Sequence, residues 1–303
     1  MKRAVIFAHF DKDDIIDDYV VYYIRCLRDI CIRLIFISTA RLPESEVSKV
    51  EGICDKVIVR ENIGYDFMSY KTGLEQLKTG DYDEVVLCND SVYGPFFPLS
   101  EMFGKMERVE CDFWGVTESC EIARHLQSYF LVFREKALKA NCFQEFWDNL
   151  FIRANKQEII DEYEVGLSQM LFNSGATGKA YCRYRPSSIE TIWMYLKKAL
   201  KKALKTISTP EKFLHPMKIA NKIQQLISGL LGMTAKCGPT FNPAHFFWRQ
   251  LIEISHMPFI KVELLRDNPM GMIITDYDDF IKSISDYNTD YIKRHLERVK
   301  KVH

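Results

Sequence analysis

Apolar residues in the first 120 positions alternate between short continuous runs and longer stretches with three- and four-residue spacing. The runs lie at 4–8, 34–37, 57–59 and 84–88. The spaced stretches lie at 15–30, after Pro43 and at 67–77. Short runs are typical of strands covered on both faces, and the spaced stretches give helices with one apolar face. The alternation predicts an α/β fold with an open, mostly parallel twisted sheet flanked by helices.

The same pattern continues, less regularly, to about residue 190. Strands are expected near 113–116, 128–133 and 180–184, and helices around 143–151 and 163–173. We therefore divide the chain into a first domain over residues 1–190 and a mainly helical C-terminal extension over 191–303. Ligands bind sheets of this kind at the carboxyl ends of the strands, so the loops after Ala8, Val59 and Cys88 are the ones to inspect.

The charge is balanced overall but unevenly distributed. Lysine and arginine number 41, as do the acids, and a net charge of zero removes the simple case for nucleic-acid binding. Nine cysteines without a C-x-x-C pair indicate reduced thiols in a cytoplasmic protein. The apolar run before Asp11 is too short for a signal peptide, and no run is long enough to span a bilayer. We expect the protein in the cytoplasm, or held at the inner face of the cell membrane.

A basic amphipathic segment, 193–236, holds nine lysines and one acid. Within it, residues 193–207 combine an apolar helical stripe with lysines beside it. Such a helix can lie on an anionic membrane surface, which suits a lipid-linked acceptor. The alternative is a helix that packs its stripe on the first domain and leaves the lysines in solvent.

A carboxylate follows the strand at 84–88, in the sequence Asn89-Asp90-Ser91. Asp90 at a strand's carboxyl end can hold Mg²⁺ or Mn²⁺ bridging a diphosphate. The alternative is a turn closed by the Asn or Asp side chain. After the strand at 57–59, Gly64 permits close backbone approach, and Asp66 is placed to accept a hydrogen bond from a ribose or sugar hydroxyl. Asp66 is equally well explained as a helix N-cap.

Two later segments carry further polar candidates. Trp114 lies in a strand that breaks into a polar loop, and His125 and Gln127 enter an otherwise aromatic strand, although a lone histidine is more often structural. Three acids occur within residues 161–164. Acids at a helix start are favoured by the helix dipole, and one facing the sheet's edge can serve as a general base.

Seven blocks of this chain closely resemble the rhamnan synthesis F family of bacterial glycosyltransferases. The blocks are Asn62–Asp66, Tyr82–Phe96, Asp112–Gly115, His125–Phe130, Tyr163–Leu167, Asn242–Pro243 and Pro258–Lys261. Their order and spacing over nearly the whole chain are more specific than any single block. The resemblance implies a GT-A nucleotide-sugar-binding fold, a role in cell-surface polysaccharide assembly and dTDP-L-rhamnose as the usual donor.

Carried over by position, the resemblance assigns roles to particular residues. Asn89-Asp90-Ser91 takes the place of the Asp-x-Asp metal motif, but only Asp90 is acidic, so the motif implies weak metal binding or none. The segment Asn62–Asp66 would grip the nucleotide. Glu164 is the first choice for the base and Asp161 the second. The other nucleotide-sugar-binding candidates are His9, Trp114, His125 and Gln127.

The implied reaction is a single inverting displacement at the sugar's anomeric carbon. Glu164 takes a proton from an acceptor hydroxyl of a saccharide or lipid-linked saccharide, and the dTDP diphosphate leaves. Aromatic walls from Tyr93, Phe96 or Trp114 suit a deoxy-sugar methyl group, although these residues are equally explained as core. The alternatives are a different sugar nucleotide and a non-catalytic subunit of a polysaccharide assembly complex. A nucleotidyltransferase is disfavoured because the loop at 9–14 is acidic and lacks glycine.

Overall fold

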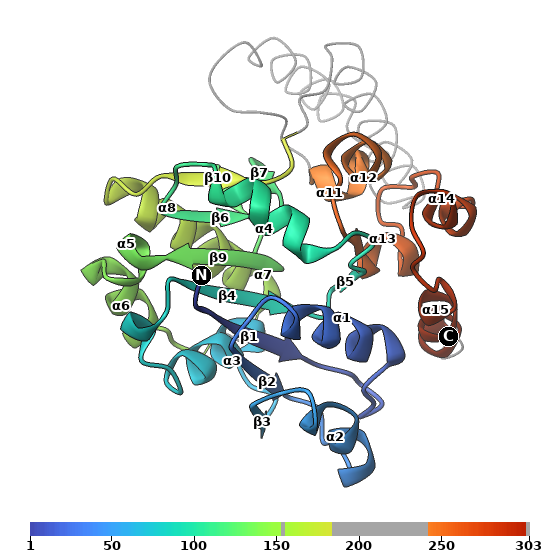
Figure 1. The fold of residues 1–303 in the computed structure, drawn as a ribbon, viewed down its shortest axis with the longest axis horizontal. Helices are drawn as coiled ribbons and strands as arrows, with labels where there is room; N and C mark the ends of the chain where they lie inside the picture. The colour runs from blue at the N-terminus through green and yellow to red at the C-terminus, as the bar shows by residue number, and fades with distance from the viewer. Residues whose placement is uncertain (153–154, 184–241, 301–303) are drawn as a thin grey trace, which may run out of the picture.

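The computed structural model describes residues 1–152, 155–183 and 242–300 and shows an α/β fold on a seven-stranded sheet (Figure 1). The order across the sheet is β10 (Gly178–Ala180), β6 (Phe113–Gly115), β9 (Phe130–Arg134), β4 (Glu84–Asn89), β1 (Arg3–His9), β2 (Arg33–Ser38) and β3 (Lys56–Val59). Neighbouring strands are parallel except where β9 runs antiparallel to β4 and β6. The expected open, mostly parallel sheet is confirmed.

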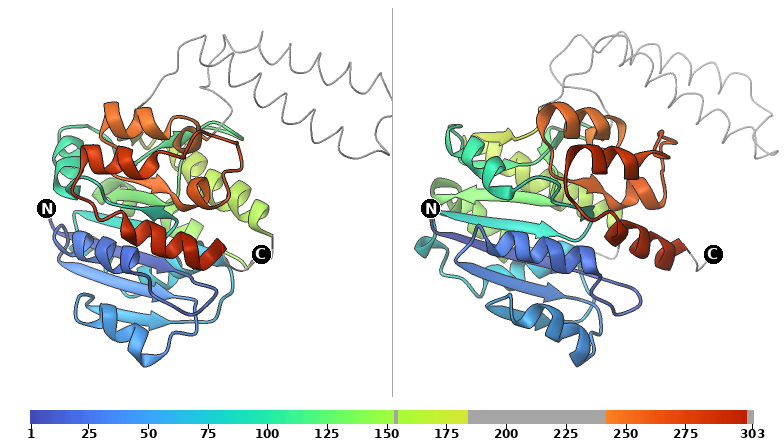
Figure 2. Two further views of the ribbon diagram at one scale, coloured as in Figure 1. Left: turned by 90° about the vertical axis from the view of Figure 1, so that its right-hand side faces the viewer. Right: turned by 45° about the vertical axis from the view of Figure 1, so that its right-hand side comes forward.

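Helices cover both faces of this sheet (Figure 2). Successive strand side chains point to opposite faces, so Val5 and Phe7 of β1 enter one apolar layer and Ala4 and Ile6 enter the other. The first layer is covered by α1 (Asp18–Arg28), α2 (Glu44–Glu51) and α4 (Leu99–Glu107). The second is covered by α3 (Tyr65–Leu74), α5 (Glu135–Leu138), α6 (Asn141–Asp148) and α8 (Gly166–Asn173).

The described C-terminal elements share the first layer of the core. They are α11 (Pro243–Phe246), α12 (Trp248–Ser255), β11 (Ile260–Lys261), α13 (Val262–Arg266), α14 (Tyr277–Ile284) and α15 (Asp290–Lys300). Trp248, Ile281 and Ile292 are buried together with β1 side chains of that layer. The strand β11 pairs antiparallel with β5 (Val92–Tyr93), which directly follows β4, so the C-terminal chain reaches the carboxyl edge of the sheet (Figure 1).

Several element boundaries differ from those expected. The helix predicted at 67–77 begins at Tyr65 and ends at Leu74. The strand predicted at 180–184 lies at Gly178–Ala180, where it pairs with β6. The helix predicted at 163–173 starts earlier, as α7 (Lys156–Ile159), and continues through the π-helix η2 (Ile160–Val165) into α8. The acids at 161–164 therefore lie inside a helical run rather than at a helix start.

The remaining short elements are the two-stranded ribbon of β7 (Glu118–Ser119) with β8 (His125–Leu126) and the 3₁₀ turn η1 (Thr79–Asp81). The basic segment 193–236, including 193–207, lies outside the described residues. Within the part of the chain that is described, no helix has the length and apolar character needed to cross a bilayer.

Candidate functional site

The turn after β4 is closed by Asn89. Its Oδ1 accepts hydrogen bonds from the Ser91 amide at 3.2 Å and the Ser91 hydroxyl at 2.6 Å, which is the turn anticipated as the structural alternative. The same side chain also reaches across to α3, because its Nδ2 donates to Asp66 Oδ2 at 2.7 Å. Asn89 thus links two of the predicted binding segments.

The loop that leads into α3 is held by a glycine and an arginine. Gly64, with φ +77°, is the N-cap residue of α3, and a Cβ there would lie 2.2 Å from Met68 Cγ. Asp66 therefore lies in the first helical turn, and its expected alternative role as the N-cap is wrong. The Arg60 guanidinium donates to the Ile63 carbonyl and to the Ser69 hydroxyl, which fixes the loop against the helix. Asn62 is exposed on this loop.

Asp90 points toward the loop after β1. Its Oδ2 accepts the Phe10 amide at 2.9 Å and lies 4.0 Å from His9 Nε2. Burial and the neighbouring charges of Asp66 and Asp11 raise the pKa of Asp90 well above its ordinary value. Burial also lowers the pKa of His9 to about 4, so His9 is a neutral neighbour. Its Nδ1 lies 2.9 Å from the Ser38 hydroxyl.

Glu164 of η2 is held by two donors from the β8–β9 loop region. Ser128 donates its hydroxyl to Glu164 Oε2, and His125 Nε2 lies 3.2 Å from Oε1. The other histidine nitrogen, Nδ1, donates to the Ala123 carbonyl at 2.8 Å, so both ring nitrogens face acceptors. This arrangement favours the imidazolium form of His125.

The pKa values of this pair move in opposite directions. Burial alone would lower the pKa of His125, but the hydrogen bonds to Glu164 and the Ala123 carbonyl outweigh it and raise that pKa above 6.5. Burial alone would raise the pKa of Glu164, but the bonds from His125 and Ser128 and the charge of Lys261 bring it below 4.5. Glu164 is therefore ionised at neutral pH.

Tyr70 of α3 is fully buried and contacts the segment that holds Glu164. Its hydroxyl donates to the Ser128 carbonyl at 3.1 Å. Burial raises its pKa well above 10, and the charges of Asp66, Asp90 and Glu164 act in the same direction. Acids from three separate segments therefore act on one phenol at the carboxyl edge of the sheet.

Lys261, which sequence reasoning did not assign, also lies at this edge. Its Nζ is 3.4 Å from the Ser91 hydroxyl and 3.9 Å from the centroid of the Tyr129 ring. The contact joins residues 170 positions apart, so only the folded chain reveals it. The available signal was the resemblance block Pro258–Lys261, in which an apolar run ends in one lysine.

Three of the predicted site residues lie outside the group around Glu164, either on the surface or in the core. Asp161 is exposed and accepts from Gln157 Nε2 at 2.8 Å. Trp114 is fully buried against Phe103, and the Gln127 side-chain oxygen Oε1 accepts from the Thr117 hydroxyl at 2.7 Å. These three side chains belong to the surface and the core rather than to the group around Glu164.

Two aromatic side chains that the sequence did not single out are exposed near this edge. Phe10 follows β1 and Tyr65 follows the Arg60–Gly64 loop, and they are 47% and 45% exposed. Tyr65 also has φ +54°, an uncommon conformation for a residue other than glycine. Such positions cluster at ligand-binding sites.

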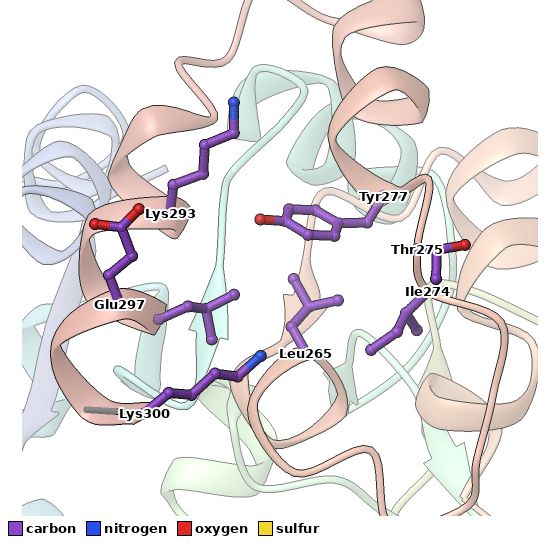
Figure 3. Close-up of a pocket in the computed structure, with 8 residues that line it drawn as sticks. Leu265, Ile274, Thr275, Tyr277, Lys293, Glu297 and Lys300 are labelled. Atoms are coloured by element: carbon purple, nitrogen blue, oxygen red, sulfur yellow. The ribbon is translucent and has the colours of Figure 1, made fainter. Parts of the chain in front are cut away.

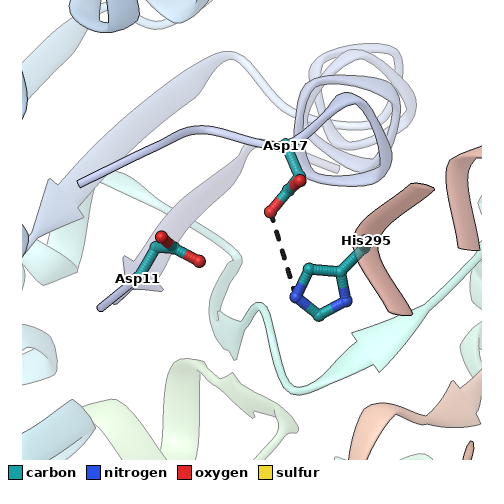
Figure 4. Close-up of side chains that lie close together, drawn as sticks. All are labelled: Asp11, Asp17 and His295. Carbon is teal, nitrogen blue, oxygen red and sulfur yellow. Dashed lines mark ion pairs between the residues drawn. The ribbon is translucent and has the colours of Figure 1, made fainter. Parts of the chain in front are cut away.

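The residues around Asp90 do not fit a resident metal ion. Among the described residues, three metal-ligating side chains come together only at Asp11, Asp17 and His295, and Asp90 is not one of them. Asp90 is engaged by a backbone amide, and the Lys261 ammonium beside Ser91 repels a divalent cation. The side chains of Asp11, Asp17 and His295 lie close together (Figure 4). Arg298 Nη2 lies 2.5 Å from a carboxylate oxygen of both Asp11 and Asp17, so these acids are already paired with a cation.

A surface pocket of about 580 Å³ lies among α13, α14 and α15 (Figure 3), and Asp66, Asp90 and Glu164 do not line it. Its lining combines an apolar floor with lysines at the rim: Leu265, Ile274, Thr275, Tyr277, Lys293, Leu296, Glu297 and Lys300. Lys293 is paired with Asp278 at 2.8 Å. None of the predicted site residues lines this pocket.

Known proteins include a relative that matches this chain over almost its full length. The chain is 28% identical to the virulence protein VirA of Vibrio anguillarum over 97% of this chain and 91% of that one. A cytidylyltransferase structure from Leptospira borgpetersenii aligns at a TM-score of 0.36 and is 11% identical, over 78% of this chain and 100% of that one. The glycosyltransferase GlyE of Streptococcus pneumoniae also aligns at a TM-score of 0.36 and is 12% identical, over 71% of this chain and 52% of that one. At that level neither structure bears on function.

The family comparison is decisive. The model of the family described as rhamnan synthesis protein F matches residues 34–187, just over half of the chain. The match spans β2 to β10 and therefore includes Asp66, the turn after β4, and Glu164 with its two donors. The chain belongs to the rhamnan synthesis protein F family.

Proposed function

We propose that this protein is a glycosyltransferase that moves L-rhamnose from dTDP-L-rhamnose to a growing, lipid-linked cell-surface polysaccharide. The observation that carries the proposal is the group at the carboxyl edge of the sheet, where Asp66, Asn89 and Ser91 are hydrogen-bonded in series. The ionised Glu164, with its two donors, belongs to the same edge. Family membership supports polysaccharide synthesis as the process.

In this proposal the nucleotide lies over the loop that carries Gly64. Asp66 accepts a hydrogen bond from a ribose or sugar hydroxyl, as its placement in the first turn of α3 allows. The exposed Tyr65 ring offers a face for the base. Asn89 fixes the orientation of Asp66 through its 2.7 Å bond, so the acceptor oxygens are positioned before the donor binds.

Glu164 serves as the base in one displacement. The acceptor hydroxyl oxygen forms a bond to the anomeric carbon, the bond from that carbon to the diphosphate oxygen breaks, and its electron pair leaves with dTDP. The hydroxyl proton passes to Glu164. Because the pKa of Glu164 is lowered, proton transfer comes late, when the attacking oxygen has become strongly acidic.

The test compares the two acids first considered as the base. Glu164→Gln should reduce transfer of rhamnose from dTDP-L-rhamnose to a lipid-linked saccharide fraction by about 100- to 10,000-fold, the range for loss of a general base. Asp161→Asn is the matched control, since that side chain is exposed on the same helical run, and it should remain within about twofold of the unchanged protein.

Three outcomes separate the alternatives. Near-normal transfer by a folded Glu164→Gln variant would remove Glu164 as the base. A panel of dTDP-, UDP- and GDP-sugars, scored by rise in melting temperature, identifies a different donor if another nucleotide stabilises the protein more. Stabilisation by none of them would contradict the proposed function.

A further inference from the structure

Lys261 is placed at the sheet's edge by backbone pairing rather than by a flexible loop. In the β5–β11 ribbon it lies opposite Val92, and the Val262 amide donates to the Ser91 carbonyl at 3.0 Å. Gly94 makes this approach possible, because a Cβ there would lie 2.3 Å from the Pro258 carbonyl oxygen. The ribbon therefore fixes the lysine next to the turn that closes β4.

The side-chain surroundings of Lys261 orient its ammonium group. The Tyr129 ring lies under Nζ, and the Ser91 hydroxyl lies beside it. Ser91 donates to Asn89, and Asn89 donates to Asp66, so a hydrogen-bonded series runs from the ammonium group to the proposed sugar- or ribose-binding carboxylate. The positive charge of Lys261 thus lies beside Ser91, the third residue of Asn89-Asp90-Ser91.

Lys261 lies where it can supply the positive charge that a metal ion at Asp90 would otherwise provide. A departing nucleoside diphosphate needs positive charge beside it, whether from a metal ion or from a preorganised side chain. We propose that the Lys261 ammonium, rather than a divalent cation on Asp90, binds the diphosphate of the donor and offsets the charge that develops on it. This inference rests on the proposed function.

The proposed contact has a defined part in the reaction. When the bond between the anomeric carbon and the diphosphate oxygen breaks, its electron pair stays on the diphosphate, and the ammonium stabilises that oxygen without giving up its proton. The contact is made in the ground state and strengthens as charge builds. Lys261 therefore affects both donor affinity and the rate of transfer.

The experiment measures binding of dTDP, dTMP and thymidine by isothermal titration calorimetry, with the full chain in EDTA. UDP and GDP are included so that a different base preference is detected. The variants are Lys261→Met, which keeps an unbranched side chain over the Tyr129 ring, and Lys261→Arg, which keeps the charge. Lys105→Met is the matched control, because Lys105 Nζ also contacts a tyrosine, 3.3 Å from the Tyr181 hydroxyl.

We expect the unchanged protein to bind a nucleoside diphosphate in EDTA. Lys261→Met should weaken that binding by about 10- to 100-fold, the loss expected for one hydrogen bond to a charged group. Thymidine binding should change by less than about twofold, since thymidine lacks phosphate, and Lys261→Arg should recover part of the loss. Lys105→Met should have no effect.

Each contrary result identifies what fails. Equal diphosphate affinity in Lys261→Met and the unchanged protein would overturn the role of Lys261 while leaving the proposed function standing. Diphosphate binding that appears only when Mg²⁺ or Mn²⁺ is added would also overturn it. No binding of dTDP, UDP or GDP under any of these conditions would contradict the proposed function itself.

Discussion

Two basic side chains from the C-terminal part of the chain reach the loops at the carboxyl edge of the sheet, and their surroundings differ. Arg298 of α15 meets the carboxylates of Asp11, Asp13 and Asp17, with nitrogen–oxygen distances of 2.5–3.1 Å. Lys261 of β11 meets a hydroxyl group and the face of a ring. Arg298 therefore pairs directly with three acids, whereas Lys261 contacts a hydroxyl group and a ring and acts on Glu164 through its charge.

The difference separates a structural role from a binding role. Three carboxylates more than neutralise Arg298, so that cluster attaches α15 to the loop after β1 and has no positive charge to offer an anion. Lys261 contacts a hydroxyl group and an aromatic face, and its charge also lowers the pKa of Glu164, so it acts on the candidate site itself. Proximity to the sheet's edge is therefore not enough to identify a binding residue.

The largest expected effect on stability is at Arg298. Arg298→Met should lower the free energy of unfolding by about 2–3 kcal/mol, because it leaves the partly buried Asp11 and Asp17 without their cation. The value is set below that of a fully buried pair since the Arg298 side chain is 21% exposed. Urea unfolding monitored by circular dichroism measures it.

Two controls complete this comparison. Arg294→Met, on the same helix, removes an exposed pair with Asp18 and should cost less than about 1 kcal/mol. Lys261→Met should also cost less than about 1 kcal/mol, because the methionine keeps the contact with the Tyr129 ring and the lost bond to the Ser91 hydroxyl is long, at 3.4 Å. Equal losses at Arg298 and Lys261 would contradict the division into structural and binding clusters.

A smaller effect is expected in the pH dependence of the His125–Glu164 pair. The raised pKa of His125 gives stability that is complete below pH 6.5 and is lost as the pH rises through the folded-state value. The lowered pKa of Glu164 gives stability that is complete above pH 4.5 and is lost as the pH falls through the folded-state value. The pair therefore stabilises the fold most between pH 4.5 and 6.5.

Glu164→Gln tests this window. The variant should lose about 1–2 kcal/mol of unfolding free energy at pH 5.5, and less once the pH has risen through the folded-state pKa of His125. NMR titration should place the His125 pKa above 6.5 in the unchanged protein and below 6.5 in the variant, because burial then acts without the carboxylate. The same His125 pKa in both proteins would contradict the assigned pair.

Much of the fold follows from local patterns in the sequence. The strands at 4–8, 34–37, 57–59 and 84–88 are confirmed to within two residues, because continuous apolar runs mark strands buried on both faces. The ends of irregular elements are less predictable. The run through Tyr163 continues as a π-helix, and nothing in its residue spacing indicates the extra residue per turn.

Part of the candidate site was predictable from the ends of strands. Asn89 and Asp66 were expected at the carboxyl edge, and their hydrogen bond brings them together there. Lys261 and Arg298 depend on how the C-terminal chain folds back over the sheet, which no local spacing encodes. Trp114 and Gln127 were predicted to bind the nucleotide sugar, but both side chains are buried in the core, because a residue next to a binding motif can also be a packing residue.

Hydrogen–deuterium exchange of the full chain with and without dTDP-L-rhamnose tests whether the donor binds at the carboxyl edge of the sheet. We expect slower exchange at 62–67, 89–92 and 258–262, the three segments that meet at the carboxyl edge, and no change around Thr275 and Glu297 of the C-terminal pocket. Protection confined to that pocket, or no protection at the three edge segments, would contradict it.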